Sequence, residues 1–446
     1  MTMTYIHNIV LKLLACIAVA ISFAGCAALD EEFIIEQDPV SGGATSGRVT
    51  SEENRDVFII WSMGFNNLSS YLKEDIDDIA SNWLPGSGRN DDVVLAFCHN
   101  TAGAYSVKTS PVLMRIYRDH DGLSHRDTLM TLSKNTNSAS SETMNEVLTY
   151  IKDNYPAKSY GMLVSSHGTG WIPEGYSSDP SGYESQTLSM RRAMGAPVPY
   201  AEVVPDDGMP LTKSIGCHNL TSKQVYEMDI TEMAEAIPMQ MDYILFDACF
   251  MGGVEVAYEL KDVCRKLVFS QTEILADGMD YVTMLSYLLE NGEPDLVGFC
   301  ENYFNHYNSQ TGAYQSATIS LVDCAQLGGL AHVCRSLFES YRHKIASLEG
   351  NADIQRYYRS GIMGHRWFFD LESILKNAGI TDEEKARVAA ALDECVVYKA
   401  ATENFMQSFQ IKEHCGFSMY LPYKGRNYLN GFYRKLKWNE DTSLIE

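Results

Sequence analysis

From residue 57 onward, the chain alternates short apolar runs, typical of β-strands, with segments whose apolar residues recur at helical spacing. Strands are expected at 57–63, 93–98, 112–117, 160–164, 243–246, 267–270 and 317–322. Helices are expected at 68–83, 144–151, 254–260, 282–291 and 295–307. Such an alternation predicts an α/β fold in which helices cover a mostly parallel central sheet.

Two of these strands lead into residues that can carry chemistry. The strand at 160–164 continues into SSHGTGW at 165–171, and the strand at 243–246 continues into DACFMGG at 247–253. His167 and Cys249 therefore stand at carboxyl ends of strands, the edge where open α/β sheets bind ligands. Cysteine with histidine is the pair that a thiol hydrolase uses, although a core cysteine and a solvated histidine are common alternatives.

The neighbouring residues favour the catalytic interpretation. An imidazole within reach of Cys249 would favour the thiolate and later protonate the leaving amine. Gly168 permits close approach of backbone, and the N–H groups of Gly168 and Cys249 are candidate donors to an oxyanion. The turn after Cys249 leads into an expected helix, whose N-terminal field would lower the pKa of the thiol. Spacing alone leaves open whether His167 and Cys249 meet.

Together with further strings in the same order, these motifs resemble the clostripain family of cysteine peptidases, relatives of the caspases and gingipains. The matching segments lie at 61–72, 155–156, 160–171, 247–259, 270–273 and 416–422. The resemblance implies a caspase-like α/β/α sandwich, a dyad of Cys249 and His167, and cleavage after Arg or Lys. It places Asp247 where the family binds the basic side chain; a strand-end aspartate that caps the next helix is the alternative.

The chain departs from the family pattern close to these motifs. Phe65 stands where members commonly carry an acidic residue, Ser165 and Ser166 replace a Trp-Asp pair, and Met279 takes the place of a tryptophan. These departures affect the expected substrate preference more than the expected reaction. Two rival functions therefore stand beside the basic-specific peptidase: a cysteine peptidase without basic preference, and a catalytically weak lipoprotein that acts as a surface binding protein.

Between the two motifs, residues 171–225 are rich in Pro and Gly and lack periodicity, so a long irregular loop is expected. The resemblance implies maturation by cleavage in this region. Arg191, Arg192 and Lys213 are candidate self-cleavage sites, or ordinary solvated charges. Because the family includes calcium-dependent members, the resemblance leaves calcium open as a cofactor. The DHDG string at 119–122 lacks a full EF-hand loop, so no metal-binding residues are assigned.

The N-terminus has the features of an export signal. An apolar stretch at 13–23 is built like a signal-peptide core, and it is followed by Ala24, Gly25 and Cys26. This order resembles a bacterial lipobox, which predicts a lipoprotein signal peptide at 1–25 and acylation of Cys26; an ordinary secretory signal is the alternative. Residues 26–54 are expected to form a flexible tether. The expected location is the cell envelope, with a lipid anchor in the outer membrane.

The net charge bears on the binding partners, and the cysteine content bears on disulfides and zinc sites. With 58 acidic and 35 basic residues the net charge is −23, which repels nucleic acid and suits basic peptide substrates. Of eleven cysteines, Cys16 leaves with the signal and Cys26 takes lipid, so at least one of the remaining thiols is unpaired. Without any C-x-x-C motif, a disulfide scaffold and a zinc ribbon are not expected.

The domain organisation follows from these patterns. Residues 55–325 are expected to form the peptidase core. Residues 326–446 are expected to form a mainly helical C-terminal subdomain that returns a strand, at 414–423, to the core.

Overall fold

The structure is a computed structural model, and it describes residues 55–88, 91–103, 106–185, 195–200, 209–212, 218–221, 223–359 and 366–446. Residues Gly43–Glu446 form one compact unit. None of the helices in the described ranges is long and apolar enough to cross a membrane. The expected signal peptide (1–25), the whole expected tether (26–54) with Cys26, and the residues Arg191, Arg192 and Lys213 lie outside the described residues.

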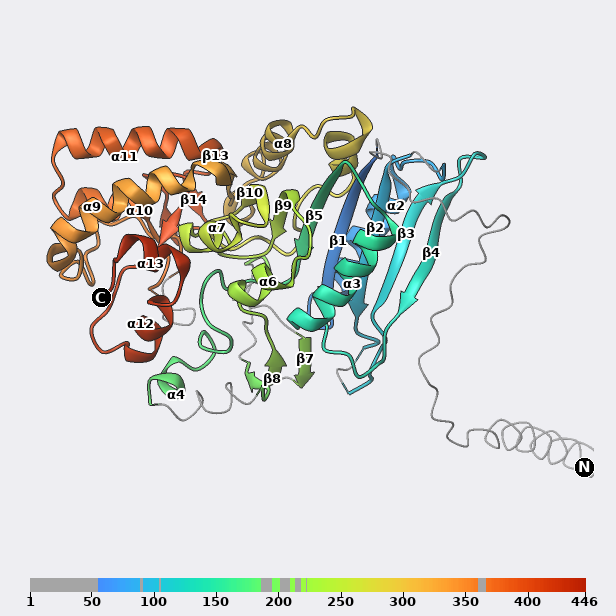
Figure 1. Cartoon of the computed structure of the whole chain (residues 1–446), viewed down its shortest axis with the longest axis horizontal. Helices are drawn as coiled ribbons and strands as arrows, with labels where there is room; N and C mark the ends of the chain where they lie inside the picture. Colours follow the sequence, from blue (N-terminus) through green and yellow to red (C-terminus); the bar gives the residue numbers. More distant parts are fainter. Residues whose placement is uncertain are drawn as a thin grey trace, which may run out of the picture. The chain divides into compact units, whose positions relative to one another are not determined.

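A nine-stranded sheet forms the centre of this unit (Figure 1). Its strands, in spatial order, are β13 (Val396–Ala401), β11 (Thr318–Asp323), β10 (Cys264–Phe269), β9 (Met241–Asp247), β5 (Ser159–Ser165), β1 (Asp56–Gly64), β2 (Val93–Asn100), β3 (Val112–Arg118) and β4 (Ser124–Thr131). The run from β10 to β2 is parallel, and the outer strands on both sides pair antiparallel. The predicted α/β class with a mostly parallel sheet is confirmed.

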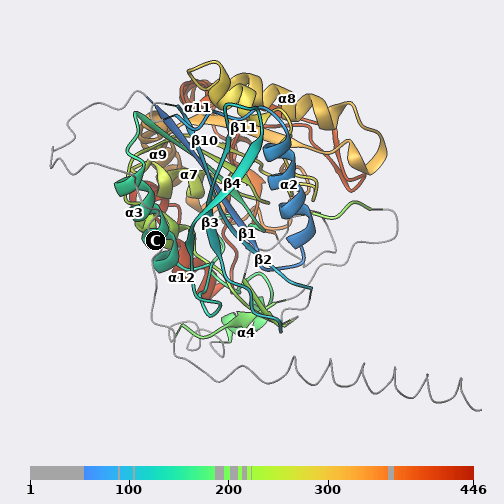
Figure 2. The ribbon, with the colours of Figure 1, turned by 90° about the vertical axis from the view of Figure 1, so that its right-hand side faces the viewer.

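Helices cover both faces of this sheet. Along β1, Val57, Ile59 and Trp61 share one hydrophobic core with α3 (Ser141–Asn154), α6 (Ile230–Ala236) and α7 (Val254–Leu260). Phe58 and Ile60 point to the opposite core, which contains α2 (Ser69–Ser81), the π-helix η2 (Ser286–Glu290) and α8 (Leu296–Asn308). Figure 2 shows α3 on one side of the strands and α2 and α8 on the other. The alternation along β1 produces this sandwich because successive strand residues face opposite sides.

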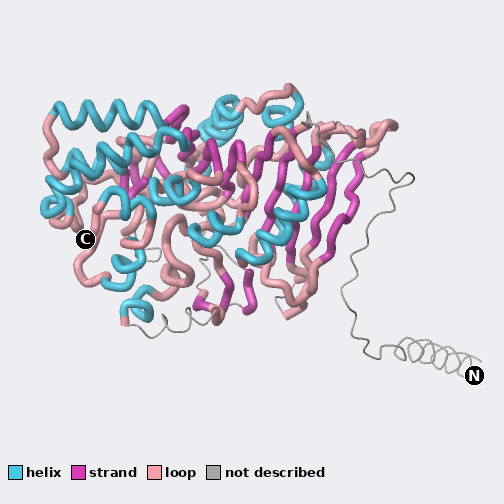
Figure 3. The backbone as a smooth tube through the Cα atoms, viewed as in Figure 1, coloured by secondary structure: helices cyan, strands magenta, loops and turns pink. Residues whose placement is uncertain are grey.

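The C-terminal part is mainly helical and packs against the β13 end of the sheet (Figure 3). Its helices are α9 (Leu327–Ile345), α10 (Leu371–Asn377), α11 (Asp382–Cys395), α12 (Asn427–Tyr433) and α13 (Lys437–Thr442), preceded by the short 3-10 helices η3 (Gly312–Tyr314) and η4 (Cys324–Gln326). Two small sheets pair β12 (Phe369–Asp370) with β16 (Ser418–Met419), and β14 (Asn404–Phe405) with β15 (Phe409–Gln410). The strand that this part adds to the main sheet is β13, which pairs with β11.

Three details differ from the sequence-based expectation. The segment 414–423 contains only the two-residue strand β16; its apolar run is buried because it packs over the start of α7, where Ser418 N donates to Gly252 O. The strand β4 was not expected, because most of its residues are exposed and polar. Within 171–225, the described residues form α4 (Pro180–Glu184) and a small sheet of β6 (Val198–Pro199), β8 (Gln224–Tyr226) and β7 (His218–Thr221), elements too short for a periodic signal.

Candidate active site

The two motif-bearing strands are direct neighbours. β5 and β9 pair in parallel, with Leu163 opposite Leu245 and Ser165 opposite Asp247. The loops that carry His167 and Cys249 therefore leave the same edge of the sheet at the same level. The hydrogen bond from Ser166 N to Asp247 O, at 3.4 Å, joins the two loops where they begin.

Two glycines allow the histidine loop to touch the cysteine loop. A Cβ atom on Gly168 would lie 2.6 Å from Cys249 O and 3.1 Å from Cys249 N, and one on Gly170 would lie 2.5 Å from Phe250 O. Both distances to oxygen are too short for any other residue without movement of backbone. The two segments predicted to supply oxyanion donors, at Gly168 and Cys249, are therefore in direct contact.

Cys249 is fully buried, and its thiol is hydrogen-bonded to the backbone of Ile274, in a third segment. Its Sγ accepts a hydrogen bond from Ile274 N at 3.1 Å and donates to Ile274 O at 3.7 Å. The following residue, Phe250, has φ of 61° and donates from its N–H to Thr272 O. A non-glycine residue in the left-handed region stores strain, and such residues cluster at functional sites. The helix α7 begins only at Val254, so residues 250–253 separate the thiol from its N-terminus.

His167 is oriented by Asn67, which follows β1. The ring Nε2 and Asn67 Oδ1 are 2.6 Å apart, and His167 is only 7% exposed. Because a carbonyl oxygen can only accept, Nε2 carries the proton and the function of a base falls to Nδ1. The sequence comparison included Asn67 only as part of a matching segment and did not assign it this orienting role.

Asp247 is fully buried in a small polar cluster. Ser165 Oγ donates to its Oδ2 at 3.1 Å, and Tyr281 OH donates to the same oxygen and lies 3.1 Å from Ser165 Oγ. Burial, followed by the charges of Asp247 and Asp75, raises the pKa of Tyr281 well above its usual range, so its phenol remains a donor. Asp247 does not cap α7, whose N-cap is Gly253 without a side-chain hydrogen bond. Sequence reasoning missed Tyr281 as a partner of Asp247.

A piece of the 171–225 region lies alongside the segment that contacts Cys249. Thr212 forms an antiparallel bridge with Leu275, and Ala276 N donates to Leu211 O at 2.9 Å. The side chain of Thr212 donates to Glu273 Oε1, also at 2.9 Å. Residues 211–212 are therefore paired with 275–276 through one isolated antiparallel bridge, next to Ile274, which contacts the thiol.

The cavities near and far from the thiol differ in character. A cavity of about 80 Å³ borders His167 and Gly168 and is lined mainly by apolar side chains, among them Met63, Met228 and Met251. A larger cavity of about 1000 Å³ lies within the C-terminal part, between residues 350–359 and 409–413. Of these two cavities, the smaller adjoins His167 and Gly168, which are expected to take part in the chemistry.

The described part of the chain offers no cluster of three or more His, Cys, Asp and Glu side chains that could hold a metal ion. In the DHDG string, Asp119 Oδ1 accepts from the N–H groups of Asp121 and Leu123, and Oδ2 pairs with His125. The eight cysteines in the described ranges are all buried and not disulfide-bonded.

A buried cysteine held against a histidine loop, at the carboxyl edge of a parallel sheet, defines the class of α/β thiol hydrolases. A family model described as the clostripain family, peptidase C11, matches residues 60–184 and 204–444, and the chain belongs to this family. It is a cysteine-type endopeptidase. A comparison with curated proteins gave no match.

Solved structures share the fold over most of the chain. One is an inactive zymogen of a C11 protease from Parabacteroides distasonis, with TM-score 0.67, 24% identity, and coverage of 88% of this chain and 99% of that one. A secreted C11 cysteine protease from Bacteroides thetaiotaomicron, iotapain, has TM-score 0.65 and 25% identity over 87% of this chain and 98% of that one. A structure of a secreted C11 protease from the same organism with an irreversible peptide inhibitor has TM-score 0.66 and 21% identity, covering 88% and 99%.

Proposed function

We propose that the chain hydrolyses peptide bonds after Arg or Lys, with Cys249 as nucleophile and His167 as general base and acid. The contact between Gly168 and the backbone of Cys249 carries this proposal, because it holds both loops at one edge of the sheet. Asp247 is the last residue of β9, the strand that leads into Cys249, and its buried carboxylate supports basic specificity because a desolvated Arg or Lys charge requires a partner.

In this mechanism, Cys249 Sγ attacks the scissile carbonyl carbon while its proton passes to His167 Nδ1. The N–H groups of Gly168 and Cys249 donate to the oxygen that gains negative charge. The tetrahedral species collapses, the amine leaves with the proton from His167, and a thioester remains on Cys249. Water then attacks the thioester with His167 as base, which releases the acid and restores the thiol.

The test is hydrolysis of fluorogenic peptides that differ only in the residue before the scissile bond: Arg, Lys, Leu or Asp. Residues 27–446 should cleave the Arg and Lys peptides, and Cys249→Ala should not. Cleavage of only the Leu peptide would contradict basic specificity and make Asp247 structural, which its two hydrogen bonds to Oδ2 would then explain. No cleavage by the wild type, before or after limited trypsin nicking of 171–225, would favour the surface binding protein.

We further propose that the chain cleaves itself after Lys213. The support is that Leu211 and Thr212, which directly precede Lys213, pair through an isolated antiparallel bridge with the segment beside Cys249. We expect the purified wild type to convert into two fragments whose new N-terminus is Ser214, while Lys213→Ala and Cys249→Ala remain intact, as read by mass spectrometry. An Arg191→Ala, Arg192→Ala double variant is the matched control and should still be cut. Cleavage at 191–192 with Lys213 untouched would contradict this assignment.

We also propose that Cys26 anchors the protein in the cell envelope through lipid. The support is its position after an apolar signal-like stretch and the small residues Ala24 and Gly25. Expression in a bacterium should give a membrane-associated, acylated protein, and Cys26→Ser should release it from the membrane fraction. An unmodified cysteine in the wild type would contradict the proposal.

A further inference from the structure

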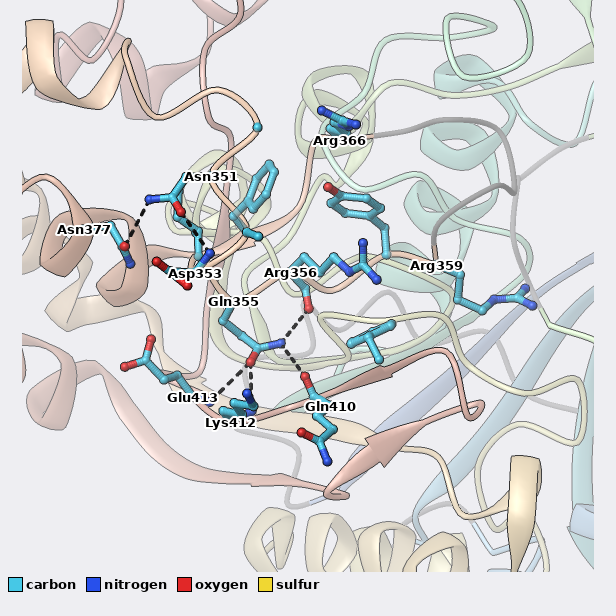
Figure 4. A pocket seen from close by; sticks show the side chains of 16 residues that line it. Asn351, Asp353, Gln355, Arg356, Arg359, Arg366, Asn377, Gln410, Lys412 and Glu413 are labelled. Atoms are coloured by element: carbon cyan, nitrogen blue, oxygen red, sulfur yellow. Dashed lines mark hydrogen bonds between the residues drawn. The ribbon is translucent and has the colours of Figure 1, made fainter.

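A buried ion pair lies next to the strand that borders the thiol. Arg359 Nε donates to Glu273 Oε2 and Arg359 Nη2 to Glu273 Oε1, both at 2.6 Å. Glu273 directly precedes Ile274, whereas Arg359 comes from the C-terminal part and lines its large cavity. Figure 4 shows Arg359 extending away from Arg356 and the other labelled side chains of that cavity. Arg359 thus belongs to the wall of the cavity, while its guanidinium points away from it and forms a bidentate pair with Glu273 in the peptidase core.

The pair is shielded from water. Glu273 is 3% and Arg359 is 8% exposed. Removal of one partner would leave an uncompensated buried charge, which is strongly destabilising, so the carboxylate oxygens of Glu273 are fixed in place by Arg359. A fixed carboxylate at the side of a substrate cleft can discriminate between groups that donate a hydrogen bond and groups that cannot.

Thr212 already makes such a hydrogen bond. Its hydroxyl donates to Glu273 Oε1 at 2.9 Å, while its backbone lies antiparallel to Leu275. In a peptide bound with this register, the next residue falls opposite Ile274, the residue whose N–H and C=O contact Cys249 Sγ. The residue opposite Ile274 is then P1, the residue directly before the scissile bond. The residue aligned with Thr212 is P2, the residue directly before P1.

We propose that Glu273, held by Arg359, makes the enzyme selective for substrates with a hydroxyl side chain, threonine or serine, at P2. This inference rests on the proposed peptide hydrolysis at Cys249. A carboxylate can only accept hydrogen bonds. It therefore stabilises a bound substrate whose P2 side chain donates one, does not stabilise a substrate with an apolar P2 side chain of the same shape, and repels a P2 carboxylate. Arg359 is a positioning residue, since it acts on the substrate through Glu273.

The experiment compares peptides with Thr, Ser, Val or Asp at P2, each made with Lys, Arg and Leu at the next position. Threonine and valine are nearly isosteric, so their ratio of kcat/KM isolates the hydroxyl. A hydrogen bond to a charged acceptor corresponds to a ratio of roughly tenfold in favour of Thr. Ser should follow Thr, and Asp should be cleaved more slowly than Val. Equal kcat/KM for Thr and Val in the wild type overturns the inference.

The series with Leu separates this inference from basic specificity. If only the Leu peptides are cleaved, basic specificity fails, while a Thr preference among them still supports the role of Glu273. If no peptide of any series is cleaved, both proposals fall.

A neutral replacement of the pair provides the second readout. The double variant Glu273→Met, Arg359→Met removes the carboxylate acceptor and both charges together, and so avoids an unpaired buried charge. It should bring the ratio of Thr to Val near one while retaining cleavage of the Val peptide. A pair with only a structural role would instead lower cleavage of both peptides equally and keep the wild-type ratio, which would contradict the inference.

Discussion

Asp247→Asn should lower kcat/KM for Lys and Arg peptides by roughly 10²- to 5 × 10³-fold, because a buried substrate cation that loses its partner costs about 3–5 kcal/mol. The change is nearly isosteric, and the amide oxygen of Asn can still accept from Ser165 Oγ and Tyr281 OH as Oδ2 does. Cleavage of the matching Leu peptide should therefore fall little, and the ratio of Lys to Leu kcat/KM measures the loss of the charge.

Asp242→Asn is the matched control for this prediction. Asp242 lies near the start of β9, the same strand that ends in Asp247, and it pairs with Arg265 at the opposite edge of the sheet. Its replacement removes an equal charge and should leave the Lys to Leu ratio unchanged. If Asp247→Asn lowers cleavage of all peptides equally, the carboxylate serves the structure of the site and not the recognition of a cation.

The strands of the core could be predicted from sequence because their burial is local information. The strands β1, β5 and β9 are continuous apolar runs, as expected of parallel strands covered on both faces, and the structure places them within one or two residues of the expected bounds. Turn glycines after β5 and β9 mark where each strand ends. The position of His167 and Cys249 at one edge follows once β5 and β9 are known to be neighbours.

The partners of the site residues could not be predicted, because they come from distant segments. Asn67 reaches His167 from the loop after β1, Tyr281 reaches Asp247 from beyond β10, and Arg359 reaches Glu273 from the C-terminal part. None of these pairs has a fixed spacing in sequence, so only the three-dimensional packing brings them together. The same holds for the segment 414–423, whose apolar run was interpreted as a strand of the core but covers the start of α7.

The stability of the chain should depend on pH through Glu255, in the first turn of α7. Glu255 is fully buried, and Tyr420 N and Tyr433 OH donate to its Oε1 at 2.8 and 2.9 Å. Burial raises the pKa of Glu255 from 4.5 to about 7, although these hydrogen bonds oppose the shift. Between pH 4.5 and 7 the unfolded chain loses the proton while the folded chain retains it, so rising pH destabilises the fold. The loss amounts to about 3 kcal/mol above pH 7.

The measurement is the free energy of unfolding in urea at pH 5 and pH 8 for the wild type and Glu255→Gln. Gln keeps an acceptor for Tyr420 and Tyr433 but has no proton to lose, so the wild type should become less stable relative to this variant as pH rises. Buried His99, His218 and His414, whose pKa values burial lowers to about 4, produce the opposite trend between pH 4 and 6.5 in both proteins and cancel in the difference. Exposed Glu235→Gln is the control and should follow the wild type at both pH values. A difference between wild type and Glu255→Gln that does not change from pH 5 to pH 8 would mean that Glu255 ionises in the fold as it does in the unfolded chain.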